Sequence, residues 1–231
     1  MKNKTPLLLL ALLLFCLIAC SEQGTQQETQ IQKHTIEGTD EAVQFACDLA
    51  FFGDSITADS NFAEYFPDRT IVNLGVYGDT LTDLLARVDE VRAAKPKQIF
   101  LLGGINCLRP DNVERCAEQY AALLDALREA CPDAAICVES VLPVGAELDP
   151  DGSENDAVRR FNAALVTLAQ EKGCDYVDIY AAYEQDGALN PALTRDGIHL
   201  NFTAYGPWAD CIAQFLTADN FKYEGIYSAG S

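Results

Sequence analysis

Acyl transfer by an enzyme needs a nucleophile, a base and a carboxylate. Histidine is the usual base, and it is the scarcest of the residue types that could fill these roles in this sequence. The chain has two histidines, and His34 lies in a polar N-terminal segment, so His199 is the base left for the rest of the chain. Asp196 stands three residues before it, in the stretch TRDGIHLN. At this spacing on an irregular loop, a carboxylate can bind one ring nitrogen and orient the other toward a nucleophile. The same two residues also fit a surface loop in which Asp196 caps a turn and His199 is solvated.

Three other stretches carry residues that complete such chemistry. FFGDSIT places Ser55 directly after an apolar run, where its hydroxyl can reach the mouth of a site. NLGVYGDT places Gly78, whose N–H can approach a substrate, before Asp79, which can cap a helix that begins near Thr80. GGIN ends in Asn106, whose side-chain amide can donate a hydrogen bond to an oxyanion. Taken alone, each of these residues also fits an ordinary turn.

Secondary structure must position these residues, and the chain alternates short apolar runs with long helical patterns. Runs rich in β-branched and aromatic residues predict five strands, at 49–53, 70–75, 98–104, 135–143 and 174–180. Apolar residues at three- and four-residue spacing predict helices over 80–94, 110–131, 154–173 and 202–216. This alternation predicts a parallel sheet covered by helices on both faces, with the function at the carboxyl ends of its strands.

The four stretches together resemble the SGNH hydrolases, also called GDSL esterases or lipases. That family is named for catalytic Ser, Gly, Asn and His in four separated blocks. GDSIT resembles the first block, NLGVYGDT the second, GGIN the third and DGIHLNFTAYGPWA the last, and the resemblance spans about residues 47–216. It implies a three-layer α/β/α sandwich with a flavodoxin-like, five-stranded parallel sheet in the order 2-1-3-4-5.

The resemblance also implies a role for each candidate residue. Ser55 is the nucleophile, and Asp196 and His199 complete the catalytic triad. The oxyanion hole consists of the Ser55 and Gly78 N–H groups and the Asn106 amide. The sequence departs from the family in the third block, because Cys107 follows Asn106 where the family usually has Asp. We interpret Cys107 as a buried or disulfide-bonded thiol, since a complete serine constellation already uses the available base.

The N-terminus predicts export. MKNKTPLLLLALLLFCLIAC places two lysines before an apolar run that is shorter than the roughly 18 to 20 residues needed to span a bilayer as a helix. Its end, LIAC, resembles the lipobox of bacterial lipoproteins, which implies lipidation of Cys20; an ordinary cleaved signal and an uncleaved short anchor are the alternatives. We therefore expect an exported lipoprotein of the cell envelope, attached to the membrane by this lipid alone. Its expected parts are a signal peptide at 1–19, a lipidated Cys and flexible tether at 20–45, a hydrolase domain at 46–219 and a tail at 220–231.

Charge and cysteine usage narrow the partners and cofactors. With 35 acidic and 16 basic residues, the chain has a formal charge of −19, which excludes nucleic acid as an expected partner. No C-x-x-C occurs and only two histidines are present, so we expect no metal site, and nothing indicates a cofactor. Seven cysteines follow Cys20, and both disulfides and buried free thiols fit them.

The expected activity is hydrolysis of a small acyl ester, in particular an acetyl ester, through an acyl-enzyme. The loops after the predicted strands are short and include no long apolar lid. The longest irregular stretch, LPVGAELDPDGSEND at 142–156, is polar and acidic, and we expect it to form one wall of an open cleft for a carbohydrate or envelope glycan. A lysophospholipase, a thioesterase or an acyltransferase with the same residues is an alternative. A further alternative is a binding module without catalytic activity.

Overall fold

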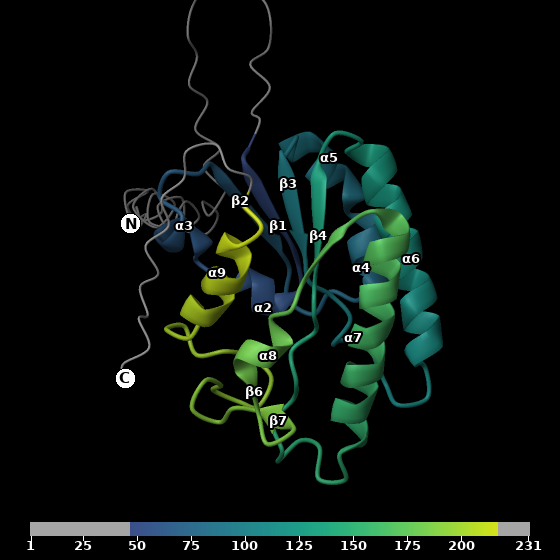
Figure 1. The fold of residues 1–231 in the computed structure, drawn as a ribbon, viewed down its shortest axis with the longest axis vertical. Coiled ribbons are helices and arrows are strands. Elements are labelled where there is room, and N and C mark those ends of the chain that lie inside the picture. Colours follow the sequence, from purple (N-terminus) through teal and green to yellow (C-terminus); the bar gives the residue numbers. More distant parts are fainter. Residues whose placement is uncertain (1–46, 217–231) are drawn as a thin grey trace, which may run out of the picture. The chain divides into compact units, whose positions relative to one another are not determined.

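The structure is a computed structural model that describes residues 47–216. Its centre is a parallel sheet of five strands in the order β2-β1-β3-β4-β5 (Figure 1). The strands are β1 (Leu49–Gly53), β2 (Ile71–Gly75), β3 (Gln98–Leu101), β4 (Ala135–Glu139) and β5 (Asp175–Val177). The predicted fold class and strand order are confirmed. The predicted signal peptide, Cys20, the tether and the tail at 220–231 lie outside the described residues.

Helices cover both faces of the sheet (Figure 1). One face carries α4 (Leu81–Ala86), α5 (Val88–Ala94), α6 (Val113–Ala130) and α7 (Ser153–Lys172). The other carries α2 (Ser55–Ala58), α3 (Phe62–Tyr65), α8 (Tyr180–Tyr183) and α9 (Gly206–Ala213). A short antiparallel pair, β6 (Glu184–Gln185) and β7 (Ala188–Leu189), follows α8. We call these two sides the α6–α7 face and the α9 face.

The buried strands supply both cores because their side chains alternate between the faces. In β1, Phe51 packs into the core of the α9 face and Phe52 into the core of the α6–α7 face. In β3, Phe100 and Leu101 divide in the same way. Strands β3, β4 and β5 end before the predicted positions 104, 143 and 180. The apolar residues after each of these strands no longer pair with a neighbouring strand, although several of them are buried. The apolar pattern of the sequence therefore indicates burial more reliably than strand pairing.

The single helix predicted over 80–94 is two helices, which meet at Arg87. The Arg87 side chain turns back toward β2, where Nε donates to the Asp79 carboxylate at 2.8 Å and Nη2 donates to the Leu74 carbonyl at 3.0 Å. The expectation that Asp79 caps the first helix is wrong. Thr80 is the N-cap, and it forms a reciprocal capping box with Asp83, so the Asp79 carboxylate is left to pair with Arg87.

The seven cysteines within residues 47–216 are all free thiols. Burial raises the pKa of the Cys47 thiol to about 11 and that of the Cys137 thiol to about 12, so these groups are inert at neutral pH. Cys107 is half-buried, and its Sγ lies 3.4 Å from the Gly104 carbonyl oxygen. The sequence fitted both disulfides and free thiols, and in this part of the chain the cysteines are free thiols. Among these same residues, no helix is long and apolar enough to cross a membrane.

Candidate active site

Ser55 lies where β1 ends and α2 begins. Asp54 occupies the N-cap position between them, and its Oδ1 accepts a hydrogen bond from the Ile56 N–H at 3.0 Å. This cap fixes the first turn of α2 and places Ser55 at the carboxyl end of strand β1, which lies between β2 and β3. Ser55 is buried, with 5% of the residue exposed. The position agrees with the rule that function gathers at the carboxyl ends of parallel strands.

Ser55, His199 and Asp196 form a continuous hydrogen-bonded series. Ser55 Oγ lies 2.9 Å from His199 Nε2, although the two residues are 144 positions apart in the chain. On the other side of the ring, His199 Nδ1 lies 2.7 Å from Asp196 Oδ2. This arrangement makes Nδ1 the donor to the carboxylate and leaves Nε2 free to accept the serine proton. The sequence-predicted nucleophile, base and carboxylate are therefore brought together.

Asp196 is held as an anion by its own loop. Burial alone would raise its pKa, but the His199 backbone N–H, the His199 ring and the Ile198 backbone N–H outweigh burial and lower the pKa to about 2. The two backbone bonds to Asp196 Oδ1 measure 2.7 Å from His199 and 3.0 Å from Ile198. The carboxylate is thus both charged and fixed in orientation across the neutral range.

Gly197 lets the loop fold back between Asp196 and His199. Its φ of +85° lies in the left-handed region, and an added Cβ would come within 2.4 Å of Glu147 Oε1 and 2.9 Å of Leu148 Cδ1. Its carbonyl also accepts a hydrogen bond from the Gly145 N–H at 2.7 Å. Residues 145–148 of the loop after β4 therefore lie against the histidine loop.

Gly78 and Asn106 lie on neighbouring loops. Gly78 has a φ of +81° and open space where a Cβ would stand, so its backbone borders an uncovered region. Asn106 Nδ2 donates a hydrogen bond of 2.9 Å to the carbonyl of Asp79, the residue after Gly78. Because an amide nitrogen carries two N–H groups, a second donor of Asn106 is left for another acceptor. The loops after β2 and β3 are thus fastened together through one of the predicted residues.

Asp54 is a buried acid that lies between Gly53 and the candidate nucleophile Ser55. Burial raises its pKa to about 7, and the Ile56 N–H and the nearby His199 offset this only in part. Its Oδ2 is buried and has no hydrogen-bond partner among the described residues. Asp54 therefore titrates near neutrality, directly beside the candidate nucleophile. The order Gly-Asp-Ser after an apolar run is the signal that locates it.

Comparison with known families agrees with this geometry. The model of the GDSL-like lipase/acylhydrolase family matches residues 51–206, a span that contains all five candidate residues. This chain belongs to the GDSL-like lipase/acylhydrolase family. It is accordingly an acylhydrolase or esterase of the GDSL type. Among curated proteins, none matches this chain.

Several solved structures have the same fold. An acetyl xylan esterase is 20% identical, covers 74% of this chain and 100% of its own, and has a TM-score of 0.63. A variant of an acetyl-xylooligosaccharide esterase from Geobacillus is 20% identical, covers 77% of this chain and 97% of its own, and has a TM-score of 0.59. A GDSL-like lipase from Bacteroides thetaiotaomicron is 20% identical, covers 73% of this chain and 87% of its own, and has a TM-score of 0.61. At these identities the likeness shows the shared fold.

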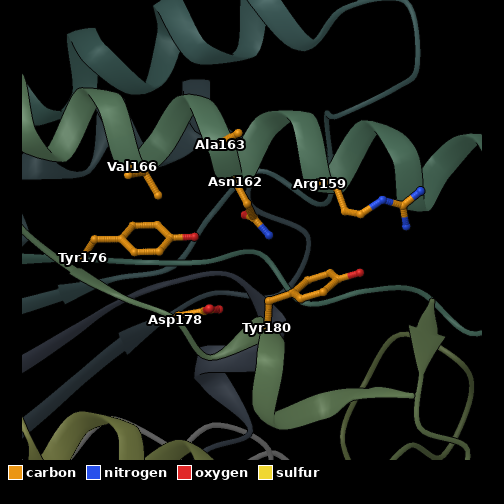
Figure 2. Close-up of a pocket in the computed structure, with 7 residues that line it drawn as sticks. All are labelled: Arg159, Asn162, Ala163, Val166, Tyr176, Asp178 and Tyr180. Atoms are coloured by element: carbon orange, nitrogen blue, oxygen red, sulfur yellow. The ribbon is translucent and has the colours of Figure 1, made fainter. Parts of the chain in front are cut away.

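A separate pocket of about 200 Å³ lies between α7 and the segment that runs from β5 into α8 (Figure 2). None of the residues that line it is a candidate catalytic residue. Its Asn162 amide is already committed to the Val141 backbone, donating to the carbonyl at 2.9 Å and accepting from the N–H at 2.8 Å. The pocket therefore follows from the way α7 anchors the loop after β4, and we assign it no chemistry.

Proposed function

We propose that this protein is a serine esterase that hydrolyses small acyl esters, in particular acetyl esters, of carbohydrate or envelope glycan. The observation that carries the proposal is the hydrogen-bonded series from Ser55 Oγ through His199 to Asp196, with distances of 2.9 and 2.7 Å. This geometry supports a nucleophile, a general base and an orienting carboxylate.

The proposed reaction has two steps. His199 Nε2 takes the Ser55 proton as Oγ attacks the ester carbonyl, and Asp196 stabilises the resulting imidazolium without taking the proton. The oxyanion accepts hydrogen bonds from the Ser55 and Gly78 N–H groups and the Asn106 amide, each worth ~3 to 4 kcal/mol in the transition state. His199 then gives the proton to the leaving alcohol. Water attacks the acyl-enzyme by the same route and releases the carboxylic acid.

Two features support a sugar as the alcohol portion. Tyr77, which precedes Gly78, is 64% exposed, and Phe202, three residues after His199, is 70% exposed. Both offer an aromatic ring to a ligand beside the proposed triad. The exposed residue Glu147 adds a polar group to the loop that contacts Gly197. Two of the structural neighbours are an acetyl xylan esterase and an acetyl-xylooligosaccharide esterase, which agrees with this substrate class.

Ser55→Ala tests the mechanism. We expect turnover of p-nitrophenyl acetate to fall about 10⁴-fold or more, because the nucleophile is removed while the fold is kept. A fluorophosphonate probe should label wild-type protein at Ser55 and leave the variant unlabelled. Unchanged turnover in Ser55→Ala, or a wild type that the probe does not label, would contradict the assignment.

A substrate panel tests the substrate class. We expect acetylated xylo-oligosaccharides to have a higher kcat/KM than acyl esters of longer chain length. A steady rise of activity with acyl chain length would instead favour the lysophospholipase or thioesterase alternative. Products formed with an added acceptor alcohol separate hydrolysis from acyl transfer.

We also propose that the protein is an exported lipoprotein of the cell envelope, attached through Cys20. The support is the sequence alone, in the order of lysines, apolar run and LIAC. Incorporation of labelled palmitate into the wild type, and its loss in Cys20→Ser together with release from the membrane fraction, is the expected result. A wild-type protein that stays unlabelled and fractionates with soluble proteins would contradict it.

A further inference from the structure

A buried carboxylate that takes no part in the reaction joins the three catalytic segments. Asp59 ends helix α2, four residues after Ser55, and its backbone N–H donates to the Ser55 carbonyl at 3.1 Å. Its side chain is 3% exposed. A carboxylate this deeply buried is stable only when its oxygens are hydrogen-bonded or paired with a cation.

Both oxygens of Asp59 have partners that adjoin catalytic residues. Oδ1 accepts a hydrogen bond from the hydroxyl of Tyr77, the residue before Gly78. Oδ2 accepts a hydrogen bond from Arg195 Nη2 at 2.5 Å, and Arg195 is the residue before Asp196. One carboxylate therefore connects the nucleophile helix, the loop after β2 and the histidine loop.

Arg195 extends this connection to the backbone of His199 and of the next residue, Leu200. Its Nη1 donates to the carbonyl of Leu200 at 2.7 Å, and its backbone N–H donates to the carbonyl of His199 at 3.1 Å. Its guanidinium also lies 4.8 Å from the centre of the Phe202 ring. The planar fork of an arginine holds the carboxylate and the carbonyl through two nitrogens at a fixed spacing, whereas a lysine has a single ammonium nitrogen.

The connection is electrostatic as well as steric. Burial would raise the pKa of Asp59, but the hydrogen bonds from Arg195 and Tyr77 outweigh it and lower the pKa below its usual value. Asp59 is therefore an anion beside the cation Arg195 throughout the neutral range. Loss of either charge would leave the other partly buried without an opposite charge beside it.

We propose that Asp59 is a positioning residue for the reaction, whose carboxylate sets the Ser55–His199 distance and holds the Gly78 segment beside them. Asp59 touches none of the reacting atoms in the proposed mechanism, and it acts through Tyr77 and Arg195. This inference rests on the proposed function, because it assigns a role within that same site. A displacement of about 1 Å between reacting groups lowers the rate about 100-fold.

Asp59→Asn tests the proposal with a side chain of the same shape. Its amide has one acceptor oxygen and no charge, so it cannot satisfy both donors as the carboxylate does. We expect kcat for p-nitrophenyl acetate to fall about 100-fold with KM within about threefold, and fluorophosphonate labelling of Ser55 to slow by a similar factor. Tyr77→Phe removes one hydrogen bond and keeps the ion pair, and should lower kcat about threefold to tenfold.

Asp48→Asn is the matched control. Asp48 also pairs with a cation, Lys97, at 2.8 Å, and its Oδ2 accepts from the Thr70 N–H, but it stands just before β1, at the opposite end of the sheet from Ser55. We expect its kcat and labelling rate to stay within about twofold of wild type. Thermal unfolding of every variant shows how much stability each change removes.

The outcomes separate this inference from the proposed function. A folded Asp59→Asn with wild-type kcat and labelling rate would overturn it, as would an equal loss of kcat in Asp48→Asn. If Asp59→Asn does not fold, Tyr77→Phe decides, and wild-type kcat in that variant counts against the proposal. A wild-type protein that the probe fails to label at Ser55 would refute the proposed function instead.

Discussion

The two faces of the sheet are built differently (Figure 1). The α6–α7 face carries long helices, with 18 residues in α6 and 20 in α7. The α9 face carries three helices of four residues each and one of eight. Long amphipathic helices satisfy their own backbones and bury one apolar stripe, whereas very short helices gain little from helix formation itself.

Side chains hold the α9 face together where the helices are too short to do so. The buried Tyr205 hydroxyl donates to the Ile56 carbonyl at 2.8 Å, and the buried Tyr183 hydroxyl donates to the Ala204 carbonyl at 2.7 Å. The first of these bonds ties α2, which begins with Ser55, to the start of α9. Irregular segments fixed in this way can present a serine and a histidine from distant parts of the chain. The comparison therefore predicts that changes near α2 and the histidine loop affect catalysis, and that changes on the α6–α7 face affect stability.

Among the substitutions that test this comparison of the two faces, Asp196→Asn should have the largest effect on kcat. The amide cannot stabilise the imidazolium and favours the wrong ring tautomer, so we expect kcat to fall about 10⁴-fold with the fold intact. Steady-state kinetics with p-nitrophenyl acetate and near-UV circular dichroism measure the two quantities. A loss of less than about tenfold would show that the 2.7 Å contact between Asp196 and His199 is not used in the reaction.

Leu124→Ala should show the opposite behaviour. Leu124 is 1% exposed in the core beneath α6, and its truncation should lower the free energy of unfolding by about 3 to 5 kcal/mol. We expect kcat below the unfolding transition to stay within about twofold of wild type, because the cavity lies on the face opposite the proposed triad. Leu85→Ala is the control, since Leu85 on α4 is 40% exposed and its loss should cost less than about 1 kcal/mol. A large fall in kcat in Leu124→Ala would break the separation of the two faces.

Asn106→Ala should lower kcat about 100- to 1000-fold, which corresponds to about 3 to 4 kcal/mol of transition-state stabilisation. The variant loses a proposed oxyanion donor and also the 2.9 Å bond to the Asp79 carbonyl. Asn61→Ala, an exposed asparagine ahead of α3, is the matched control and should leave kcat within about twofold. Equal kinetics for the two variants would remove Asn106 from the proposed site.

The sequence predicts the sheet, and it identifies Ser55, Asp196 and His199, which the fold brings within hydrogen-bond distance, because both rest on local signals. Five apolar runs of strand length give the strands, and Ser55 and His199 stand in short stretches whose residue types already indicate chemistry. The split of the helix at Arg87 escapes such reasoning, since the apolar spacing continues through both helices. At the break Arg87 bonds to Asp79 in the preceding loop and to Leu74 on β2, contacts that the apolar spacing does not report.

The contacts between distant segments also cannot be predicted from local sequence patterns. Asp59 and Arg195 are 136 positions apart, and neither has a spacing that marks it. Both adjoin predicted catalytic stretches, so a search for charged residues next to each stretch can find them. The raised pKa of Asp54 results from burial, which a sequence motif alone does not report.

Glu139 at the end of β4 should give the smallest effect of these substitutions. It tests how the stability of the α9 face depends on pH. It is buried on the α9 face, where its Oε1 accepts a hydrogen bond from the Trp208 indole N–H at 2.6 Å. Burial raises its pKa from 4.5 to about 8, and the Trp208 bond offsets this only in part. Between these two values the folded protein keeps a proton that the unfolded chain has lost. The free energy of unfolding must therefore fall as pH rises through this window.

Glu139→Gln separates this contribution from the rest of the protein. Glutamine can still accept the Trp208 hydrogen bond but does not titrate, so the variant should lose less stability than the wild type as pH rises. Urea unfolding at pH 5, 6.5 and 8 should show a difference that widens with pH by about 1 kcal/mol or more, in favour of the variant. The raised pKa of Asp54 acts in the same direction, but it is common to both proteins and cancels in the difference. Parallel stability curves would mean that Glu139 is ionised in the folded protein. The buried polar groups of the α9 face would then stabilise the charged Glu139 carboxylate beyond what the hydrogen bond from Trp208 contributes.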